Sequence, residues 1–360
     1  MLPSAGIQSI LRKREMLMSE LRRDPMTGGW VIIATDRGHR PSDFGSVGAV
    51  RRSGFCPFCP GNEATTPPEI RAYRDPGSAP NSPGWKVRTI PNKYAALGIE
   101  GDLAREGLGV YDKMNGVGAH EVIIETADHN RYIPDFSQEE MTQVIRMYRD
   151  RTSDLKKDSR FRYIQIFKNH GGAAGASLEH SHSQVIALPI TPRWVKQELI
   201  CSREYYAIKE RCLLTDIIRQ EIHEGLRVVY ENEHFLTFCP YAAKFPFEIW
   251  IAPKNVVQND FCMIQDNQIG DMADSLIRVL RALRSGLEDP PFNFIIHSAP
   301  SKYPKAGAWQ TIDQDFLWHL EMIPRLTRIA GFEWGTGCHI NPTPPEDSAV
   351  FLRERIAEES

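Results

Sequence analysis

Residues 169–184 read NHGGAAGASLEHSHSQ and continue into the apolar run VIALP of residues 185–189. The apolar run bounded by Pro189 predicts a β-strand, along which alternate side chains share a face. His180, His182 and Gln184 would then line one face, just after a glycine-rich loop. Small residues let backbone N–H groups approach an anion closely, as phosphate-binding loops do. The stretch therefore predicts a site for attack on a phosphate; the simpler alternative is a solvated strand end.

Length and composition limit the class of protein. The chain has 360 residues, which at roughly 100–200 residues per domain predicts about two domains. A net charge of −3 gives no electrostatic footprint for nucleic acid. No apolar run approaches the roughly 20 residues that span a membrane, and the charged N-terminal segment does not resemble a secretory signal. Seven cysteines, an odd number, fit a reducing cytoplasm, so we expect a cytoplasmic protein that contacts neither nucleic acid nor membrane.

Local patterns predict the same order of elements twice. The first half has a helix over residues 138–156, with Ser137 and Glu140 as a capping box, and the second has one over residues 267–285. The first twenty residues also look helical, and the Pro- and Gly-rich residues 54–84 predict a long irregular loop. Strands are predicted at residues 85–90, 121–125, 162–167 and 184–188, and again at 227–230, 234–239, 248–252, 293–297 and 317–323.

This repeated order predicts an internal duplication in which only the first copy kept the full set of chemical groups. Both copies end on strands of which the last carries histidine. Alternating strands with one helix per half favour an α+β fold with mainly antiparallel sheets. We therefore expect two domains, residues 1–192 and 193–360, with the reactive groups in the first.

Cys56-x-x-Cys59 fits a metal half-site, a redox pair or two inert thiols. A redox pair needs a helix that starts at the first cysteine, and Pro60-Gly61 blocks such a helix. Zinc needs four ligands, so a metal site requires two more, which histidines usually supply. The best placed are His129 and His180; a structural zinc there would also fix the strand that carries His182.

His182 and Gln184 predict transfer of a phosphorus-bearing group by way of a covalent intermediate. A neutral imidazole can attack phosphorus without losing a proton first, and the transferred group then sits on nitrogen as a labile phosphoramidate. The Gln184 amide could donate to a non-bridging phosphate oxygen. A third histidine at that position could instead deliver a proton and favour hydrolysis, which a glutamine cannot do.

Three further motifs support a family resemblance: RRDPMTGGW at residues 22–30, CPFCPGNE at 56–63 and VRTIPNKYAAL at 87–97. With the His-x-His-x-Gln segment, they make the chain similar, over about residues 21–346, to the galactose-1-phosphate uridylyltransferase branch of the histidine-triad superfamily. The resemblance implies two histidine-triad-like half-barrel domains, a homodimer, and ping-pong chemistry through a nucleotidyl-histidine.

The same resemblance implies roles for individual residues. His182 matches the nucleophile, and the structural zinc ligands match Cys56, Cys59, His129 and His180. The positions that contact the nucleotide and its phosphates match Arg37, Arg40, Asn92, Asn169, Gly175, Ser177 and Gln184.

The C-terminal sugar-binding segment departs from the family pattern. Members strict for galactose 1-phosphate carry a Tyr-Glu pair there, whereas residues 331–342 read GFEWGTGCHINP, with Thr336 and Gly337 in place of that pair. This pattern resembles a divergent subgroup that includes plant ADP-glucose phosphorylases. Gly335 and Thr336 are the predicted sugar-side residues, and we expect a more open sugar pocket than in the strict enzymes.

The second metal site of many relatives is not predicted to be complete. Glu198 has His297 and His319 as possible partners, but Glu321 stands where a histidine is usual. The subgroup's alternative Cys-x-x-Cys is also half missing, because Thr215 follows Cys212 at the required spacing, and Lys254 is followed by Asn255 instead of histidine.

The sequence thus predicts transfer of a nucleoside monophosphate from a nucleotide sugar to a sugar 1-phosphate. The leading prediction is a UDP-glucose:hexose-1-phosphate uridylyltransferase of galactose metabolism, and the alternative is an ADP-glucose phosphorylase that uses phosphate as acceptor. A dinucleotide polyphosphate hydrolase and a non-catalytic nucleotide-binding protein are weaker alternatives, because Gln184 disfavours the first and His182 the second. The base, the sugar and the acceptor stay open.

Overall fold

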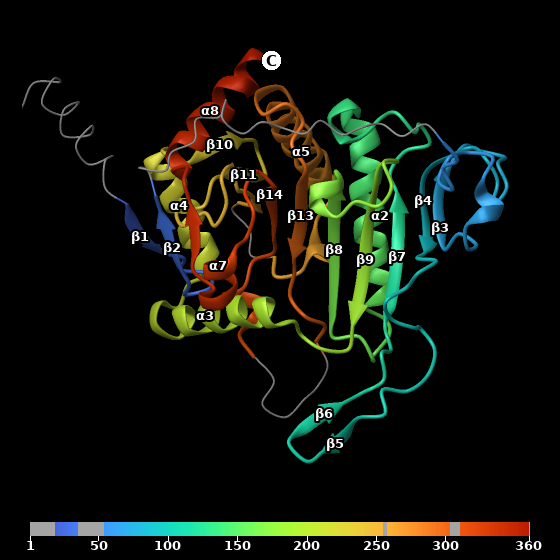
Figure 1. Ribbon diagram of the computed structural model, residues 1–360, viewed down its shortest axis with the longest axis horizontal. Helices are drawn as coiled ribbons and strands as arrows, with labels where there is room; N and C mark the ends of the chain where they lie inside the picture. The colour runs from blue at the N-terminus through green and yellow to red at the C-terminus, as the bar shows by residue number, and fades with distance from the viewer. Residues whose placement is uncertain (1–18, 35–53, 255–257, 303–309, 360) are drawn as a thin grey trace, which may run out of the picture.

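A computed structural model describes residues 19–34, 54–254, 258–302 and 310–359 of the chain. One ten-stranded, antiparallel sheet forms its centre, in the order β10-β11-β12-β14-β13-β8-β9-β7-β4-β3 (Figure 1). The first half of the chain supplies β3 (Arg71–Arg74), β4 (Trp85–Pro91), β7 (Ala119–Ile124), β8 (Tyr163–His170) and β9 (His182–Leu188). The second half supplies β10 (Val228–Glu231), β11 (Phe235–Phe238), β12 (Ile249–Pro253), β13 (Phe292–His297) and β14 (His319–Pro324).

The sheet consists of the same five-strand unit twice. Within each half the last two strands exchange places relative to chain order, giving 3-4-7-9-8 and 10-11-12-14-13. The two units join where β8 pairs antiparallel with β13, with Asn169 opposite Asn293. The expected α+β fold, mainly antiparallel and internally duplicated, is confirmed; in the described residues the two halves form one continuous sheet that does not close into a barrel. The division at residue 192 stays a prediction.

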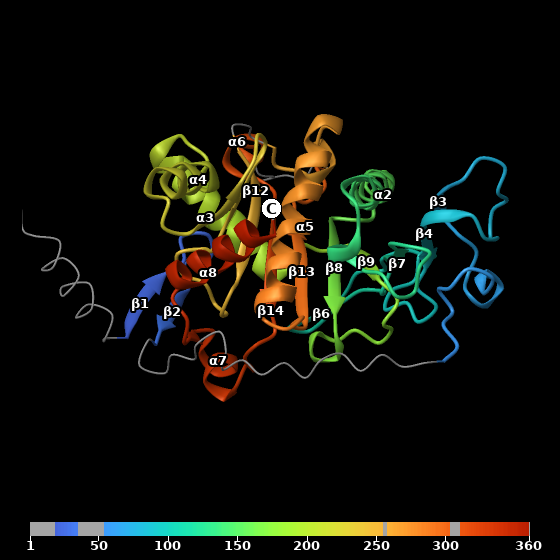
Figure 2. The same cartoon turned by 90° about the horizontal axis from the view of Figure 1, so that it is seen from above.

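Two long helices cover one face of the sheet. They are α2 (Gln138–Leu155) and α5 (Asp266–Gly286), which lie side by side with α8 (Pro345–Glu358) next to α5 (Figures 1 and 2). Ser137 and Glu140 form the predicted capping box at the start of α2. The helices bury their apolar faces on alternate strand residues such as Ile166, Val185 and Phe294. The other strand residues, including His182 and Gln184, face away from these helices.

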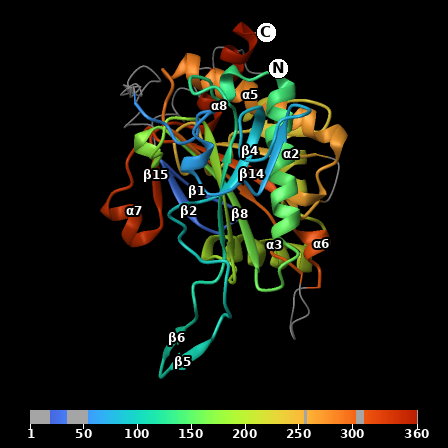
Figure 3. The same cartoon turned by 90° about the vertical axis from the view of Figure 1, so that its right-hand side faces the viewer.

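The remaining elements lie around the sheet. A small sheet joins β1 (Glu20–Arg23), β2 (Trp30–Ile33) and β15 (His339–Asn341), while the hairpin β5 (Glu106–Leu108) and β6 (Tyr111–Lys113) projects from the body (Figure 3). The other helices are α3 (Arg193–Lys209), α4 (Leu213–Glu224), α6 (Ile312–Asp315) and α7 (Gly331–Thr336). In the described part of the first half, α2 is the one α-helix, as expected. The expectation of one helix was wrong for the second half, where α3, α4, α6, α7 and α8 add to α5. The predicted N-terminal helix lies outside the described residues.

Candidate functional site

His182 is the first residue of β9 and is only 7% exposed. Its Nδ1 lies 2.8 Å from the backbone oxygen of His180. A carbonyl oxygen can only accept, so Nδ1 carries the proton and Nε2 presents its lone pair. Burial, together with the nearby Lys168 ammonium, lowers the pKa of His182, which keeps the imidazole neutral. The geometry is that of a nitrogen nucleophile.

A buried polar network holds β9 in place on the sheet face that α2 covers. The Lys168 ammonium donates to the His182 backbone oxygen at 3.0 Å and to a Glu125 carboxylate oxygen at 2.5 Å. Glu125 also accepts from Ser181 and Ser183, and from the Tyr148 hydroxyl of α2 at 2.8 Å. The sequence pattern did not single out these residues, because their spacing matches no motif and only the sheet brings them together.

Gln184 meets two side chains from neighbouring strands. Its Oε1 lies 2.7 Å from Nε2 of His120, on β7, and 3.4 Å from Nδ2 of Asn92, which follows β4. The structure thus joins the predicted Asn92 and Gln184. His120 was missed from the sequence, since its contact with Gln184 depends on the register that sets Val122 opposite Gln184.

The predicted phosphate-binding loop connects β8 to β9. Gly171 and Gly175 have φ values of 78° and 88°, which favour glycine and turn the chain sharply ahead of His182. Ser177 is exposed in this loop. Asn169, at the end of β8, accepts a hydrogen bond from Asn293 of β13 at 2.8 Å, so its amide position depends on the second half of the sheet.

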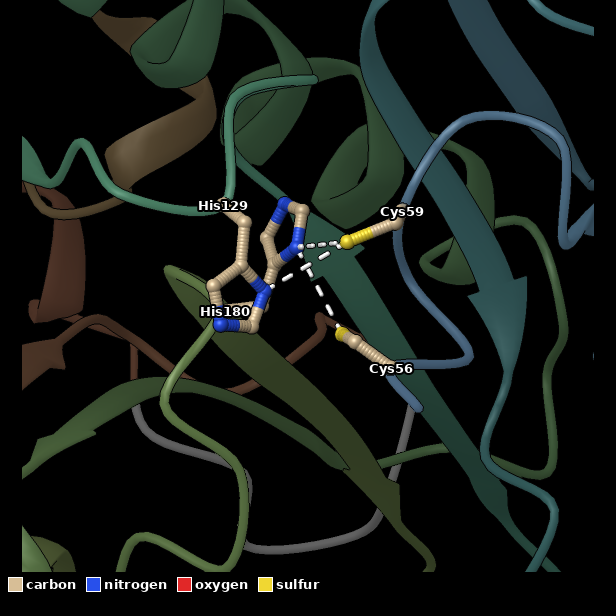
Figure 4. A group of neighbouring side chains, drawn as sticks. All are labelled: Cys56, Cys59, His129 and His180. Atoms are coloured by element: carbon tan, nitrogen blue, oxygen red, sulfur yellow. Dashed lines mark hydrogen bonds between the residues drawn. The ribbon is translucent and has the colours of Figure 1, made fainter. Parts of the chain in front are cut away.

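Cys56, Cys59, His129 and His180 converge on one point (Figure 4). Their ligand atoms all lie within 4.8 Å of one another, with S···N separations of 3.4 Å (Cys59–His129), 3.6 Å (Cys56–His180) and 3.7 Å (Cys59–His180). His180 donates from Nε2 to the Thr126 backbone oxygen at 2.8 Å, which leaves Nδ1 facing the thiols. Burial lowers the pKa of His180 to about 4, so its ring is neutral. The four predicted ligands form a group able to hold a metal ion.

This group is joined to His182 by short connections. Only Ser181 separates His180 from His182. The Phe58 ring packs edge-on against both imidazoles, with centroids 6.2 and 5.5 Å away. A metal bound to Cys56 and Cys59 would therefore act on the position of β9.

A second group of ligands lies at the matching place in the other copy. His319 is the first residue of β14, and its Nδ1 faces the Leu317 oxygen at 3.4 Å, much as His182 faces His180. Glu321 then takes the place of Gln184, and a carboxylate there would repel a phosphate. The second copy therefore lacks the amide that Gln184 offers in the first.

The expected partners of Glu198 do lie beside it. A Glu198 carboxylate oxygen lies 2.9 Å from His297 Nδ1, and Glu198, His297 and His319 offer ligand atoms within 4.8 Å of one another. Glu321 lies 3.6 Å from Nε2 of both histidines. Cys212 instead packs in an apolar cluster with Trp250, so it does not join them.

Of the remaining predicted residues, the structure describes only Gly335 and Thr336, which are not brought to His182. Arg37 and Arg40 lie outside the described residues. Gly335 and Thr336 lie on α7, which packs next to β15; in Figures 1 and 2, α7 stands well apart from β9.

Among the described helices, none has the length and apolarity needed to traverse a bilayer.

Comparison with known proteins shows the family of the chain. Residues 9–192 match the N-terminal domain of galactose-1-phosphate uridyl transferase, and residues 117–359 match a domain of unknown function. The ADP-glucose phosphorylase of Arabidopsis thaliana is 36% identical, covering 93% of this chain and 92% of that protein. The galactose-1-phosphate uridylyltransferase of Thermotoga maritima is 29% identical, covering 95% of this chain and all of that one.

Solved structures give the same result. An Arabidopsis ADP-glucose phosphorylase with bound ADP-glucose superposes with a TM-score of 0.78 at 33% identity, covering 94% of this chain and 99% of that one. A uridylyltransferase superposes with a TM-score of 0.72 at 26% identity, covering 95% and 99%. Fold and site therefore define a nucleotidyltransferase. The chain belongs to the galactose-1-phosphate uridylyltransferase family, and its similarity to ADP-glucose phosphorylase matches the subgroup that the C-terminal segment indicated.

Proposed function

We propose that this enzyme transfers a nucleoside monophosphate through a covalent intermediate on His182 Nε2. The observation that carries the proposal is the hydrogen bond from His182 Nδ1 to the His180 oxygen, which directs the lone pair of Nε2 outward. Nε2 attacks the α-phosphorus of a nucleotide sugar, and the bond to the sugar 1-phosphate breaks. An acceptor phosphate oxygen then attacks the same phosphorus and frees the histidine. The Gln184 amide donates to a non-bridging oxygen at which charge develops.

The donor and acceptor that we propose first are ADP-glucose and inorganic phosphate. Two observations favour this pair: the 36% identity to an ADP-glucose phosphorylase, and Thr336 and Gly337 where strict enzymes have their sugar-gripping pair. The second candidate is uridylyl transfer between UDP-glucose and a hexose 1-phosphate, supported by the relative at 29% identity. In either case a glycine cannot bond a sugar hydroxyl, so discrimination between glucose and galactose 1-phosphates would be weak.

We propose further that Cys56, Cys59, His129 and His180 hold one structural zinc ion. A tetrahedral zinc with bonds of about 2.3 Å to sulfur and about 2.0–2.1 Å to nitrogen separates those atoms by about 3.6 Å. The observed S···N separations of 3.4–3.7 Å fit this ion. We also propose a homodimer, on the family resemblance, and leave a second metal at Glu198 and His319 unassigned.

A labelling experiment tests the reaction. The protein is incubated with each of ADP-glucose, UDP-glucose and other nucleotide sugars, without acceptor, and its intact mass is measured. We expect one added nucleoside monophosphate on wild type and on the exposed-histidine control His223→Asn, and none on His182→Asn. Adding phosphate, glucose 1-phosphate or galactose 1-phosphate should then discharge the adduct at rates that rank the acceptors.

Two results would contradict the proposal. Transfer by His182→Asn at a rate close to wild type would exclude the covalent mechanism. A preference above about a thousandfold for galactose 1-phosphate over the other acceptors would show that the sugar side is selective despite Thr336 and Gly337, since a site that bonds a hydroxyl rejects analogues by about 10⁴-fold.

A further inference from the structure

We infer that His120 is a positioning residue that sets which way the Gln184 amide points. This inference rests on the proposed function, because it concerns the group that Gln184 offers to the phosphate. The side chain of His120 extends from β7 on the same sheet face as Gln184, one diagonal step away across the β7–β9 pair. It is half-buried between Gln184, Asn92 and the backbone of Ala96.

The backbone at Ala96 determines the tautomer of His120. The Ala96 N–H donates to His120 Nδ1 at 3.2 Å, so Nδ1 carries no proton. A neutral ring must then carry its proton on Nε2, which lies 2.7 Å from Gln184 Oε1. The partner of a ring N–H has to be an acceptor, so the amide oxygen of Gln184 faces His120.

Asn92 reinforces the same orientation. Its Oδ1 accepts from the Tyr94 N–H at 2.9 Å, so its Nδ2 is turned toward His120 and Gln184. That nitrogen donates to Gln184 Oε1 at 3.4 Å. It also lies 3.0 Å from His120 Nε2, but both nitrogens carry protons, so this contact is not a hydrogen bond and the orientation rests on the Ala96 and Tyr94 contacts. A flipped Gln184 would set its own NH₂ against two groups that are both donors, so the flipped state is disfavoured.

The orientation of the Gln184 amide decides which of its two groups meets the phosphate. With its oxygen held by His120 and Asn92, Gln184 has its NH₂ group left to donate to a developing phosphate charge. Without His120, the amide can turn its oxygen toward the phosphate and repel it. His120 would thus act on the transition state through Gln184 and touch no substrate itself.

A double-mutant cycle tests this dependence. Single-turnover labelling rates are measured for wild type, His120→Phe, Gln184→Ala and the double variant, together with donor affinity and thermal midpoint. We expect His120→Phe to slow labelling by about 10- to 100-fold, as misplaced groups do, with little change in donor affinity or midpoint. In the Gln184→Ala background, His120→Phe should lower the labelling rate by less than about twofold. His120→Gln, which keeps an N–H donor, should recover part of the rate.

Multiplicative losses in the double variant would overturn the inference, because they would mean that His120 acts independently of Gln184. If wild type forms no adduct with any donor, the proposed function fails, and the inference is judged separately by the ¹⁵N shifts of the His120 ring. Protonation at Nε2 in wild type supports it, and protonation at Nδ1 overturns it.

Discussion

Lys168 and Glu125 form an ion pair next to β9, the strand that begins at His182, and the pair has almost no contact with solvent. Their side chains are 2% and 0% exposed. Burial alone would raise the pKa of Glu125, but the Lys168 ammonium and the bonds from Ser181 and Ser183 hold it below its ordinary value. Burial lowers the pKa of the Lys168 ammonium, and the Glu125 carboxylate opposes that shift. Either partner left alone would be an uncompensated buried charge.

We predict that Lys168→Met lowers the free energy of unfolding by about 3–5 kcal/mol, as for other broken buried pairs. The double variant Lys168→Met/Glu125→Met should lose less of the free energy of unfolding than Lys168→Met alone. Urea denaturation measures both. The control Lys157→Met removes an exposed lysine bonded to Asp154 and should cost no more than about 1 kcal/mol. A single variant as stable as this control would show that the pair contributes no stability.

At the scale of elements, the Cys/His group connects three segments that the sheet alone does not fix. Cys56 and Cys59 belong to the long loop before β3, His129 follows β7, and His180 precedes β9. A metal ion here would add to the apolar contacts by which Cys56 and Phe58 of this loop pack against Trp85 and other sheet residues.

We predict about one tightly bound zinc per chain by elemental analysis. Removing it with a chelator, or changing Cys59→Ser, should lower the thermal midpoint by several degrees while zinc-free protein that remains folded still labels His182. Cys262→Ser, away from the group, serves as the matched control. A Cys56–Cys59 disulfide and no metal in freshly reduced protein would contradict the zinc assignment.

At the scale of the whole molecule, the two halves share one sheet. β8 pairs with β13 along five residue pairs, and α2 packs against α5. Separating the halves would expose a row of unpaired backbone groups on β8 and the apolar side of α2, both of which promote association.

We predict that a fragment of residues 1–192 alone is aggregated or self-associated by size-exclusion chromatography with light scattering. Mixing it during refolding with residues 193–360 should restore a one-to-one complex that labels His182. A monomeric fragment with a cooperative melting transition would instead support two independent domains divided at residue 192.

The sequence by itself determined the local features. The capping box at Ser137, most strands of the ten-stranded sheet, the glycine-rich turn before β9 and the Cys56-x-x-Cys59 pair follow from short spacings, because turns, caps and strand periodicity act over a few residues. It missed α3, α4 and α8, which its repeated pattern of one helix per half did not include.

Only the tertiary structure decided which distant residues meet. His120 reaches Gln184 across 64 positions, and Lys168 reaches Glu125 across 43, through strand register that no local pattern records. The pairing of β8 with β13 likewise joins two copies of one unit into a single sheet. Register depends on the packing of whole faces, so these contacts had to be read from the folded chain.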